Sequence, residues 1–402
     1  MEEITKPKQA VILAGGKGTR LLPITNNKPK PMIEFHGKVF LEYLIEMVRE
    51  QGFKRILLLL GYLPEVVQDY FGDGSKWGIE IKYSVTDVEN NTGRRIKLAE
   101  NLIDPVFLLM YCDNYWPMRI DKMWRQFVSA NVSALVTVYL NKDHYTKDNL
   151  RVDEHGCVEI YDKSRTAPNL QGVDIGFLIL RKGVLGLLPE RGNVSFEETV
   201  YPELIRNRQL RAYLTEHRYY SVGSHERLNL TNEFLLRKPT VILDRDGVLN
   251  KNPPKAQYVC RWDDWEWIPG AKEAIRLLKD AGFRIIVVTN QAGIARGFMT
   301  ESDLEIIHEK MQKELLQCGG SIDRIYYCPH GWNDNCECRK PKPGMFFQAQ
   351  RDFNLDLSLT FFVGDDERDR QVGHAAECKT LLVDSESSLL KVVKEKILSN
   401  SS

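Results

Sequence analysis

The sequence predicts an α/β protein built from two doubly wound domains, each a mostly parallel sheet covered by helices. Its 402 residues exceed the roughly 100–200 residues of a single domain. Short apolar runs rich in β-branched residues alternate with helical patterns along the chain, which is typical of parallel sheets with helical crossovers. This alternation restarts after Pro239, which cannot continue a helix. We therefore expect domains at residues 1–238 and 239–402.

The expected elements follow from these runs. In the first domain the expected strands are 10–14, 55–60, 79–83, 106–111, 132–140 and 173–180, and the expected helices are 40–51 and 224–238. In the second domain a strand begins at Thr240, further strands are expected at 284–288, 322–327 and 360–363, and helices are expected at 269–281 and 301–317.

The composition excludes several classes of protein. Lys and Arg together number 55, as do Asp and Glu, so bulk charge does not favour a nucleic acid or an acidic membrane as partner. A hydrophobic content of 43% argues against disorder, and no apolar run reaches the length of a membrane span. The polar first residues do not resemble a signal peptide. We expect a cytoplasmic protein that binds neither membrane nor nucleic acid; its oligomeric state stays open.

A glycine-rich segment follows the first expected strand. Gly15, Gly16 and Gly18 allow a tight turn whose N–H groups can face an anion, and Arg20 adds a guanidinium. The spacing fits neither the dinucleotide fingerprint nor the Walker A loop, and such glycines can also form only a turn. Lys30 stands between two prolines that restrict the backbone and could aim it, although a lone lysine can also be a solvated surface charge.

Together these residues resemble the opening signature of the sugar-phosphate nucleotidyltransferases, here LAGGKGTRLLPITNNKPKPM. The resemblance covers about residues 8–236 and implies a Rossmann-like domain that transfers a nucleoside monophosphate from an NTP to a sugar 1-phosphate. It implies that the three glycines and Arg20 hold the nucleotide phosphates and that Lys30 neutralises charge at the reacting centre. GTP is expected as the nucleotide from the family rather than from any residue.

Later positions extend this resemblance. It implies that Asp113, after a buried strand, is a Mg²⁺ ligand and that Lys163 binds the sugar phosphate. Asp174, Gly176 and Glu197 are the implied contacts to the sugar.

Two positions depart from the family. Ser221 stands where the family has a second metal-binding aspartate, and serine is a poorer ligand for a hard cation. The loop ENNTGRRIK keeps only Thr92 and Gly93 of the family pattern and adds two arginines. A domain that binds nucleotide or sugar phosphate without catalysing transfer therefore remains an alternative.

In the second domain, acidic residues follow a buried strand. Asp244 and Asp246 are two residues apart, so they share a face in extended backbone, and such paired carboxylates suit phosphoryl transfer near Mg²⁺. A solvated acidic turn is the simpler interpretation of this segment alone. Thr289, Lys340 and Asp365 follow later strands or loops in the same domain.

This order of residues resembles the haloacid dehalogenase (HAD) superfamily of phosphatases, from Thr240 to about Leu398. The resemblance implies a HAD-like domain in which Asp244 becomes an aspartyl phosphate and Asp246 is the acid and base. It implies that Thr289 and Lys340 hold the phosphoryl group. Asp365 would bind Mg²⁺ with Asp244 and the Asp246 carbonyl oxygen; Asp369 is left out of this set.

Four potential zinc ligands lie within eleven residues: Cys328, His330, Cys336 and Cys338. This set suits a closed tetrahedral Zn²⁺ site with a structural role, rather than a disulfide or unrelated thiols. The zinc would stiffen the loop that carries Arg339 and Lys340.

The motifs DRDG, TNQAGIARG and CRKPKPG resemble the heptose 1,7-bisphosphate 7-phosphatases and histidinol-phosphate phosphatases, which implies that Asn290 and Arg339 contact substrate. Asp366 departs from this pattern, which often has a basic residue there. The tryptophans between Tyr258 and Trp267 either pack or wall the substrate entrance.

The two resemblances together predict a bifunctional enzyme. A 7-phosphatase acting on D-glycero-α-D-manno-heptose 1,7-bisphosphate leaves heptose 1-phosphate, and a guanylyltransferase would convert this with GTP into GDP-heptose. The alternative is a mannose 1-phosphate guanylyltransferase joined to a phosphatase of the histidinol-phosphate type. The expected cofactors are Mg²⁺ and Zn²⁺.

Overall fold

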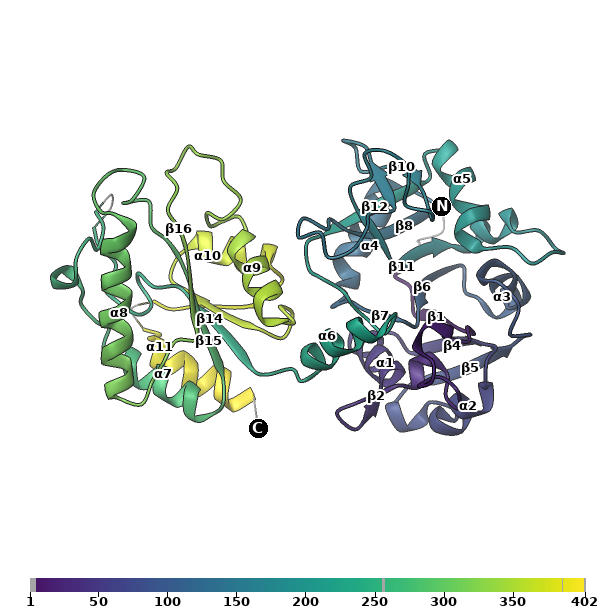
Figure 1. Cartoon of the computed structure of the whole chain (residues 1–402), viewed down its shortest axis with the longest axis horizontal. Helices are drawn as coiled ribbons and strands as arrows, with labels where there is room; N and C mark the ends of the chain where they lie inside the picture. The colour runs from purple at the N-terminus through teal and green to yellow at the C-terminus, as the bar shows by residue number, and fades with distance from the viewer. Residues whose placement is uncertain (1–4, 255–256, 385, 401–402) are drawn as a thin grey trace. The chain divides into compact units, whose positions relative to one another are not determined.

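The computed structural model describes residues 5–254, 257–384 and 386–400. The chain divides into two compact units, Met1–Leu235 and Leu236–Ser402, each with its own sheet and core (Figure 1). The predicted α/β class is confirmed in both. Among the described residues, no helix combines the length and the apolar character that crossing a membrane requires.

The first unit is built on a seven-stranded sheet in the order β12-β8-β11-β6-β1-β4-β5. Its strands are β1 (Gln9–Ala14), β4 (Arg55–Leu60), β5 (Glu80–Val85), β6 (Val106–Tyr111), β8 (Ala134–Tyr139), β11 (Val173–Arg181) and β12 (Leu210–Thr215). All neighbouring pairs are parallel except those of β11, which runs antiparallel to β6 and β8. The expectation of a mostly parallel sheet is correct, and β11 is its exception.

Helices cover both faces of this sheet. They are α1 (Phe40–Glu50), α2 (Pro64–Phe71), α3 (Thr92–Leu98), α4 (Ile120–Ala130), α5 (Phe196–Arg206) and α6 (His225–Leu235). Successive side chains of a strand point to opposite faces, so Val11 packs into the core beneath α3 and α5 while Ile12 packs into the core beneath α1. Both strand faces are therefore buried, which explains why β1 reads as a continuous apolar run.

Short strands complete the first unit. They form the pairs β2 (Glu34–Phe35) with β3 (Lys38–Val39), β7 (Asn114–Tyr115) with β13 (Tyr220–Ser221), and β9 (Leu150–Val152) with β10 (Val158–Tyr161). The pairing of β7 with β13 brings the segment before α6 against the residues that follow β6.

The second unit has a five-stranded, fully parallel sheet in the order β16-β15-β14-β17-β18. Its strands are β14 (Thr240–Leu243), β15 (Arg284–Asn290), β16 (Arg324–Cys328), β17 (Phe361–Gly364) and β18 (Lys379–Leu382). Its helices are α7 (Ala271–Asp280), α8 (Glu301–Gln317), α9 (Gly344–Phe353), α10 (Glu367–Ala375) and α11 (Leu389–Val392). The central strand β14 ends at Leu243, so Asp244 is the first residue beyond the sheet.

Candidate active sites

The glycine-rich segment of the first unit borders a cavity of about 440 Å³ at the ends of β1 and β6. Leu13 and Tyr111 are paired in these parallel strands, so the segments after both strands lie at the same edge of the sheet. Lys30 and Asp113 meet in the cavity, where the Lys30 Nζ lies 2.7 Å from the Asp113 Oδ2. The predicted residues that line this cavity are Gly15, Gly16, Gly18, Lys30 and Asp113.

Gly18 and Gly15 are required for local geometry. Gly18 has a φ of 65°, in the left-handed region that favours glycine, and a Cβ there would lie 3.0 Å from the Lys30 side chain. A Cβ on Gly15 would lie 2.4 Å from the Arg95 guanidinium. Arg20 is exposed and is not among the residues lining the cavity, so the structure does not bring it to the other phosphate-binding candidates.

Arg95 explains part of the unusual ENNTGRRIK loop. Its buried guanidinium donates hydrogen bonds to the carbonyl oxygens of Leu60, Gly15 and Val88 and to the hydroxyl of Thr86. These bonds join α3 to Gly15 after β1, to Leu60 at the end of β4, and to Thr86 and Val88 after β5, so Arg95 fixes the wall of the cavity.

Two of the predicted sugar-site residues, Lys163 and Glu197, line a second, smaller cavity of about 320 Å³. Lys163 is exposed, and its Nζ lies 2.8 Å from the Oε2 of Glu198. Burial raises the pKa of Glu197, whose Oε2 accepts a hydrogen bond from Ser195. Thr92 lines the nucleotide-side cavity and donates to the same Glu197 oxygen, so it connects the two cavities.

Asp174 and Gly176 line neither of these cavities, but each lies against a residue that lines one of them. Burial raises the pKa of Asp174, which accepts hydrogen bonds from the Gly176 N–H and the Tyr201 hydroxyl, each at 2.8 Å. A Cβ on Gly176 would lie 2.8 Å from the Tyr111 ring, which lines the first cavity. Glycine at position 176 therefore permits close packing of β11 on the end of β6.

Ser221 precedes Val222, whose N–H donates a hydrogen bond to the Asp113 carbonyl oxygen. It is buried and pairs with Asn114 across β13 and β7, while its carbonyl accepts a hydrogen bond from Thr231. No group of three potential metal-binding side chains occurs in the described part of the first unit. Asp113 is thus paired with the Lys30 ammonium, and no second carboxylate stands at the Ser221 position.

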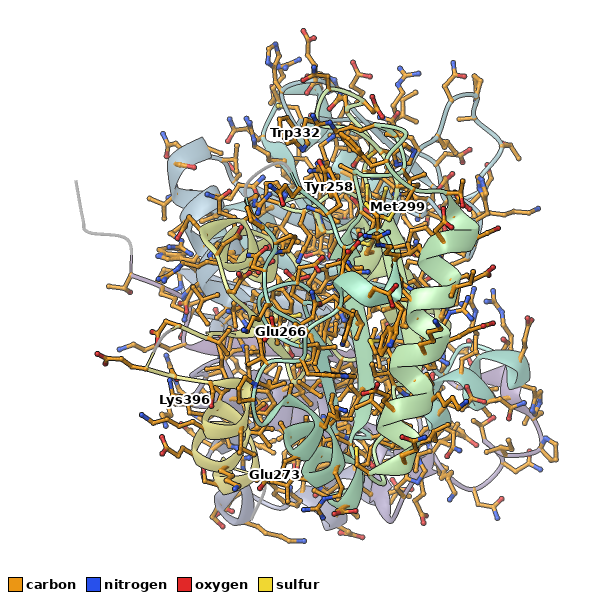
Figure 2. The ribbon with its side chains drawn as sticks, turned by 90° about the vertical axis from the view of Figure 1, so that its left-hand side faces the viewer. Tyr258, Glu266, Glu273, Met299, Trp332 and Lys396 are labelled. Atoms are coloured by element: carbon orange, nitrogen blue, oxygen red, sulfur yellow. The ribbon has the colours of Figure 1, made fainter. Side chains whose placement is uncertain are left out.

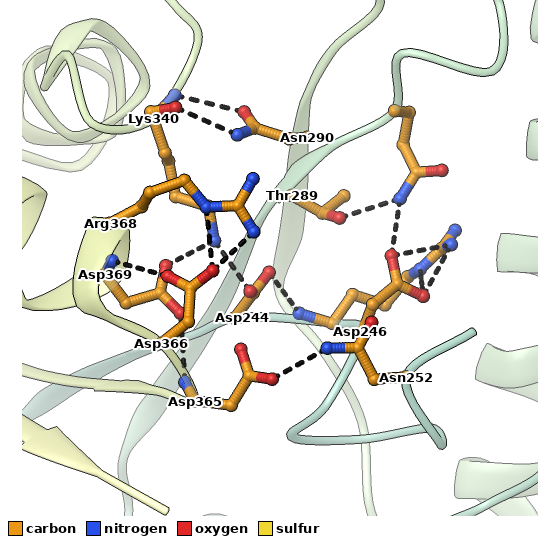
Figure 3. Close-up of polar contacts among 12 residues, drawn as sticks. Asp244, Asp246, Asn252, Thr289, Asn290, Lys340, Asp365, Asp366, Arg368 and Asp369 are labelled. Carbon is orange, nitrogen blue, oxygen red and sulfur yellow. Dashed lines mark hydrogen bonds and ion pairs between the residues drawn. The ribbon is translucent and has the colours of Figure 1, made fainter. Parts of the chain in front are cut away.

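In the second unit, the predicted catalytic residues converge at the carboxyl edge of the parallel sheet (Figure 3). Asp244 follows β14, Thr289 and Asn290 end β15, and Asp365 follows β17. A cavity of about 490 Å³ opens here, the volume of a small-ligand site. The predicted residues that line it are Asp244, Asp246, Thr289, Asn290, Arg339, Lys340 and Asp365.

Lys340 is held by two buried carboxylates and by Asn290. Its Nζ lies 2.8 Å from Asp244 Oδ2 and 2.7 Å from Asp369 Oδ1. The Asn290 side chain accepts from the Lys340 N–H at 3.0 Å and donates to its carbonyl at 3.1 Å. Asn290 therefore fixes the backbone that carries Lys340, in addition to lining the cavity.

The environments of Asp244 and Asp246 differ in charge. Burial raises the pKa of Asp244 to about 8, against the opposing effect of Lys340. Burial also favours a raised pKa for Asp246, but Arg245, Asn250 and Gln291 donate hydrogen bonds to its carboxylate and lower the pKa overall. Asp246 is therefore the more acidic of the two carboxyls when no cation is bound.

The acidic cluster suits a hard divalent cation. Carboxylate oxygens of Asp244, Asp365 and Asp369 lie within 4.8 Å of one another, with the single ammonium of Lys340 beside them. Burial also raises the pKa of Asp365 to about 6. Three carboxylates around one lysine retain a net negative charge, and oxygen ligands of this kind are what Mg²⁺ prefers.

A basic residue reaches this cavity despite the acidic Asp366. Arg368, two residues later, lines the cavity and donates from its Nε to Asp366 Oδ2 at 2.7 Å (Figure 3). The resembled family often has a basic residue at position 366. In this chain the basic side chain at the cavity comes instead from Arg368, at the start of α10.

The four predicted zinc ligands form one cluster. Donor atoms of Cys328, His330, Cys336 and Cys338 lie within 4.8 Å of one another. The sulfur–sulfur separations are 3.6 Å for 328–336, 3.3 Å for 328–338 and 3.5 Å for 336–338. A tetrahedral site with Zn–S bonds of about 2.3 Å separates its sulfurs by about 3.8 Å, so the cluster fits Zn²⁺ and is too wide for disulfides.

The tryptophans of the 258–267 stretch pack rather than wall the cavity. Trp262, Trp265 and Trp267 are half-buried against the core, and the rings of Trp262 and Trp265 stack 5.4 Å apart. None of the three lines the catalytic cavity, whereas Tyr258 at the start of the stretch does.

Several residues of this site were missed by the sequence reasoning. The sequence analysis leaves Asp369 out of the predicted metal ligands. In the structure Asp369 lies on the first turn of α10 and pairs with Lys340. Gln291 donates to both Thr289 and Asp246, and Asn252 donates to Asp365. The TNQAG motif contained the signal for Gln291, while nothing local indicated Asn252.

Comparison with known proteins agrees with this division. The family model described as nucleotidyl transferase matches residues 9–237, and that described as polynucleotide kinase 3 phosphatase matches residues 240–386. A D-glycero-beta-D-manno-heptose-1,7-bisphosphate 7-phosphatase of Pseudomonas aeruginosa is 42% identical over 148 residues, 37% of this chain and 82% of that protein. The chain belongs to the nucleotidyl transferase family and, in its second unit, to that of these heptose-bisphosphate phosphatases.

Further relatives support both halves. The phosphatase of the same name from Bordetella bronchiseptica is 43% identical over 143 residues, covering 36% of this chain and 79% of that protein. The crystal structure of HddC from Yersinia pseudotuberculosis is 25% identical with a TM-score of 0.50, covering 57% of this chain and 99% of that one. A putative glucose-1-phosphate thymidylyltransferase from Bacillus anthracis shares the fold, with a TM-score of 0.50 at 19% identity and coverage of 56% and 93%. This chain is therefore an enzyme that joins a nucleotidyltransferase to a phosphatase.

Proposed function

We propose that the two units catalyse consecutive steps in the synthesis of a nucleotide-activated heptose. The phosphatase would remove the 7-phosphate of D-glycero-α-D-manno-heptose 1,7-bisphosphate, and the transferase would join GMP from GTP to the heptose 1-phosphate. One observation carries the proposal: the phosphatase unit belongs to a family whose named reaction leaves a sugar 1-phosphate, on the same chain as a nucleotidyl transferase. The relatives are named for the beta anomer, so the alpha anomer is specific to this proposal.

In the phosphatase step, Asp244 is the nucleophile because its carboxylate lies beside Lys340 at the floor of the cavity. Its oxygen bonds to the phosphorus as the bond to the sugar oxygen breaks, and Asp246 gives that oxygen a proton. Water then attacks the aspartyl phosphate while Asp246 takes up a proton from it, which releases phosphate and restores the Asp244 carboxylate and the protonated Asp246. Lys340 and Thr289 hold the phosphoryl oxygens throughout.

Asp244, Asp365 and the Asp246 carbonyl would hold Mg²⁺, and Asp369 stands in the same acidic cluster. When bound, the cation supplies positive charge that offsets the charge of the transferring phosphoryl group. Arg339 and Asn290 remain the proposed contacts to the substrate. Asn290 also binds the backbone of Lys340.

In the transfer step, a sugar 1-phosphate oxygen attacks the α-phosphorus of the NTP and pyrophosphate leaves. Positioning and charge neutralisation supply most of the catalysis in such reactions. Gly15, Gly16 and Gly18 would offer backbone N–H groups to the phosphates, and Lys30 would neutralise charge beside Asp113, a proposed Mg²⁺ ligand. Arg20 does not line the cavity, so it would have to move in order to bind the nucleotide phosphates.

A coupled assay on the whole chain tests the proposal. The chain is supplied with each anomer of heptose 1,7-bisphosphate, Mg²⁺ and GTP, and phosphate, pyrophosphate and GDP-heptose are measured separately. We expect all three products with the alpha anomer. Histidinol phosphate as the preferred phosphatase substrate would instead favour the alternative pairing with mannose 1-phosphate guanylyltransferase.

The buried Ser221 favours one further candidate function for the first unit. With no carboxylate beside Asp113 at this position, the unit could bind nucleotide or sugar phosphate without transferring it. Phosphate release without pyrophosphate from GTP, ATP, CTP or UTP would support this candidate, and Mg²⁺-dependent pyrophosphate release would exclude it.

A further inference from the structure

Three aromatic side chains, two of them exposed, lie at or next to the phosphatase cavity. We call Tyr258, Phe298 and Trp332 the aromatic rim. Trp332 and Tyr258 line the same cavity as Asp244, and Figure 2 shows both at one end of the second unit. Trp332 is 61% exposed and Phe298 is 56% exposed. Bulky rings left open to water beside a catalytic cavity suit contact with a ligand better than packing.

Arg296 holds the three rings together. Its guanidinium carbon lies 5.2 Å from the ring centroids of both Trp332 and Phe298, and 5.8 Å from that of Tyr258. Its Nη1 donates a hydrogen bond to the Tyr258 hydroxyl at 3.1 Å. Cation–π contacts with three rings at once restrict where the Trp332 indole can lie.

The rim is assembled from three segments. Tyr258 comes from the loop after β14, Arg296 and Phe298 from the turn after β15, and Trp332 from the loop between His330 and Cys336. The Ala295 N–H donates to the Pro329 carbonyl, and a Cβ on Gly293 would lie 3.0 Å from the Tyr258 ring. The turn after β15 is therefore attached to both of the other segments.

We propose that the Trp332 indole is the platform on which the sugar ring of the phosphatase substrate stacks, and that Arg296 is the residue that positions it. This inference rests on the proposed function. A pyranose presents axial C–H groups on one face, which pack on an indole, and hydroxyls at its edge, which remain in water. The open aromatic face of Trp332, which lines the same cavity as Asp244, matches such a ring.

The place of Trp332 favours a sugar over a macromolecular partner. Tyr258 and Trp332 of the rim line the cavity that holds Asp244, so a ligand whose phosphate reaches Asp244 can also contact Trp332. The cavity of about 490 Å³ accommodates a phosphorylated sugar. The basic side chains of Arg339 and Arg368 line the same cavity and suit an anionic sugar derivative.

Steady-state kinetics of the whole chain test the inference, with heptose 1,7-bisphosphate compared against acetyl phosphate, which has no ring. We expect Trp332→Ala to lower the selectivity ratio, kcat/KM for the sugar over kcat/KM for acetyl phosphate, by about tenfold, mainly through KM. Trp332→Phe should restore about half of the lost selectivity on a logarithmic scale. Arg296→Ala should lower the ratio less than Trp332→Ala, because the indole stays but is less constrained.

The matched control is Leu316→Ala, which removes a 62% exposed apolar side chain on α8 that does not line the cavity. Its selectivity should equal that of the wild type. A wild-type enzyme that prefers acetyl phosphate would overturn the proposed function. Full sugar selectivity in Trp332→Ala, with the wild type still preferring the sugar, would overturn only the inference about Trp332.

A binding measurement gives a second readout that does not depend on turnover. In the Asp244→Asn background, heptose 1,7-bisphosphate should change the tryptophan fluorescence, and inorganic phosphate should change it much less. The change should disappear when Trp332→Phe is added. An unaltered fluorescence change in that double variant would contradict the stacking of the sugar on Trp332.

Discussion

Lys340 and Asp369 form a buried ion pair, with the Lys340 Nζ 2.7 Å from the Asp369 Oδ1. The two residues are 4% and 1% exposed, so their charges are almost fully removed from water. Asp369 also accepts the N–H of Asp365 at 2.9 Å, which ties the lysine to the proposed metal site. Asp369 therefore aims Lys340 at Asp244 and shapes the turn that carries Asp365.

Asp369→Asn should reduce phosphatase turnover by about a hundredfold. The amide cannot neutralise Lys340, so the ammonium is less firmly aimed, and small displacements of a catalytic group cost rate on this scale. Turnover of the variant is compared with that of Asp280→Asn, which changes an exposed carboxylate at the end of α7. Circular dichroism of both variants checks folding, and a folded Asp369→Asn chain with normal kcat would contradict this role.

Asp244→Asn should abolish phosphatase turnover and leave pyrophosphate release unchanged. The amide is a poor nucleophile. Asp244 lies in the second unit and lines the phosphatase cavity, whereas the proposed transfer site lies in the first unit. Both activities are measured on the same preparation with heptose bisphosphate and with heptose 1-phosphate plus GTP. Loss of both activities in a folded variant would mean that the units are functionally coupled.

The sequence was most informative where catalytic residues directly follow buried strands. Asp244, Thr289 and Asp365 could be placed at one sheet edge because parallel strands end on the same side. The close spacing of Cys328, His330, Cys336 and Cys338 was similarly sufficient to predict a cluster.

Other features depend on contacts between distant segments, which a single sequence does not encode locally. The apolar run of β11 is the same whether the strand is parallel or antiparallel, so its direction was not predictable. The ion pair between Asp369 and Lys340, which are 29 residues apart, depends on the orientation of α10. The position of Trp332 at the phosphatase cavity was not predictable, because an isolated tryptophan in a loop gives no periodic signal.

Lys30→Met should lower pyrophosphate release by about a hundredfold with little effect on the phosphatase. The variant removes the cation that lies 2.7 Å from Asp113 in the nucleotide-side cavity, where charge would build up during transfer. Lys28→Met is the matched control, because Lys28 pairs with Glu34 and does not line the cavity. Equal rates in the two lysine variants would remove Lys30 from the proposed transfer site.

Cys336→Ser should lower both the bound zinc and the thermal stability of the second unit. One of four ligands is replaced by a hydroxyl with low affinity for Zn²⁺, and the free energy of metal binding contributes to folding. Zinc is measured by mass spectrometry after dialysis, and unfolding is followed by calorimetry. Cys260→Ser, outside the cluster, is the control, and a zinc content of Cys336→Ser equal to that of this control would contradict the ligand set.

Asp143 anchors a largely buried polar cluster of the first unit. It accepts hydrogen bonds from the Tyr139 hydroxyl and from the Arg218 Nε at 3.0 Å. Burial alone favours a raised pKa for Asp143, but these donors outweigh it and hold the pKa below the ordinary value of 3.8. The carboxylate therefore stabilises the fold fully above pH 3.8, and this contribution is lost as the pH falls further.

Asp143→Asn should lower the free energy of unfolding at pH 7 by about 1–3 kcal/mol, the scale of a hydrogen bond to a charged group. The wild type and the variant should then converge in stability as the pH falls below 3.8, because protonation removes the same charge in the wild type. Urea unfolding followed at several pH values measures the difference. A difference that stays constant below pH 3.8 would mean that the amide disrupts packing around Tyr139 rather than the charge interaction with Arg218.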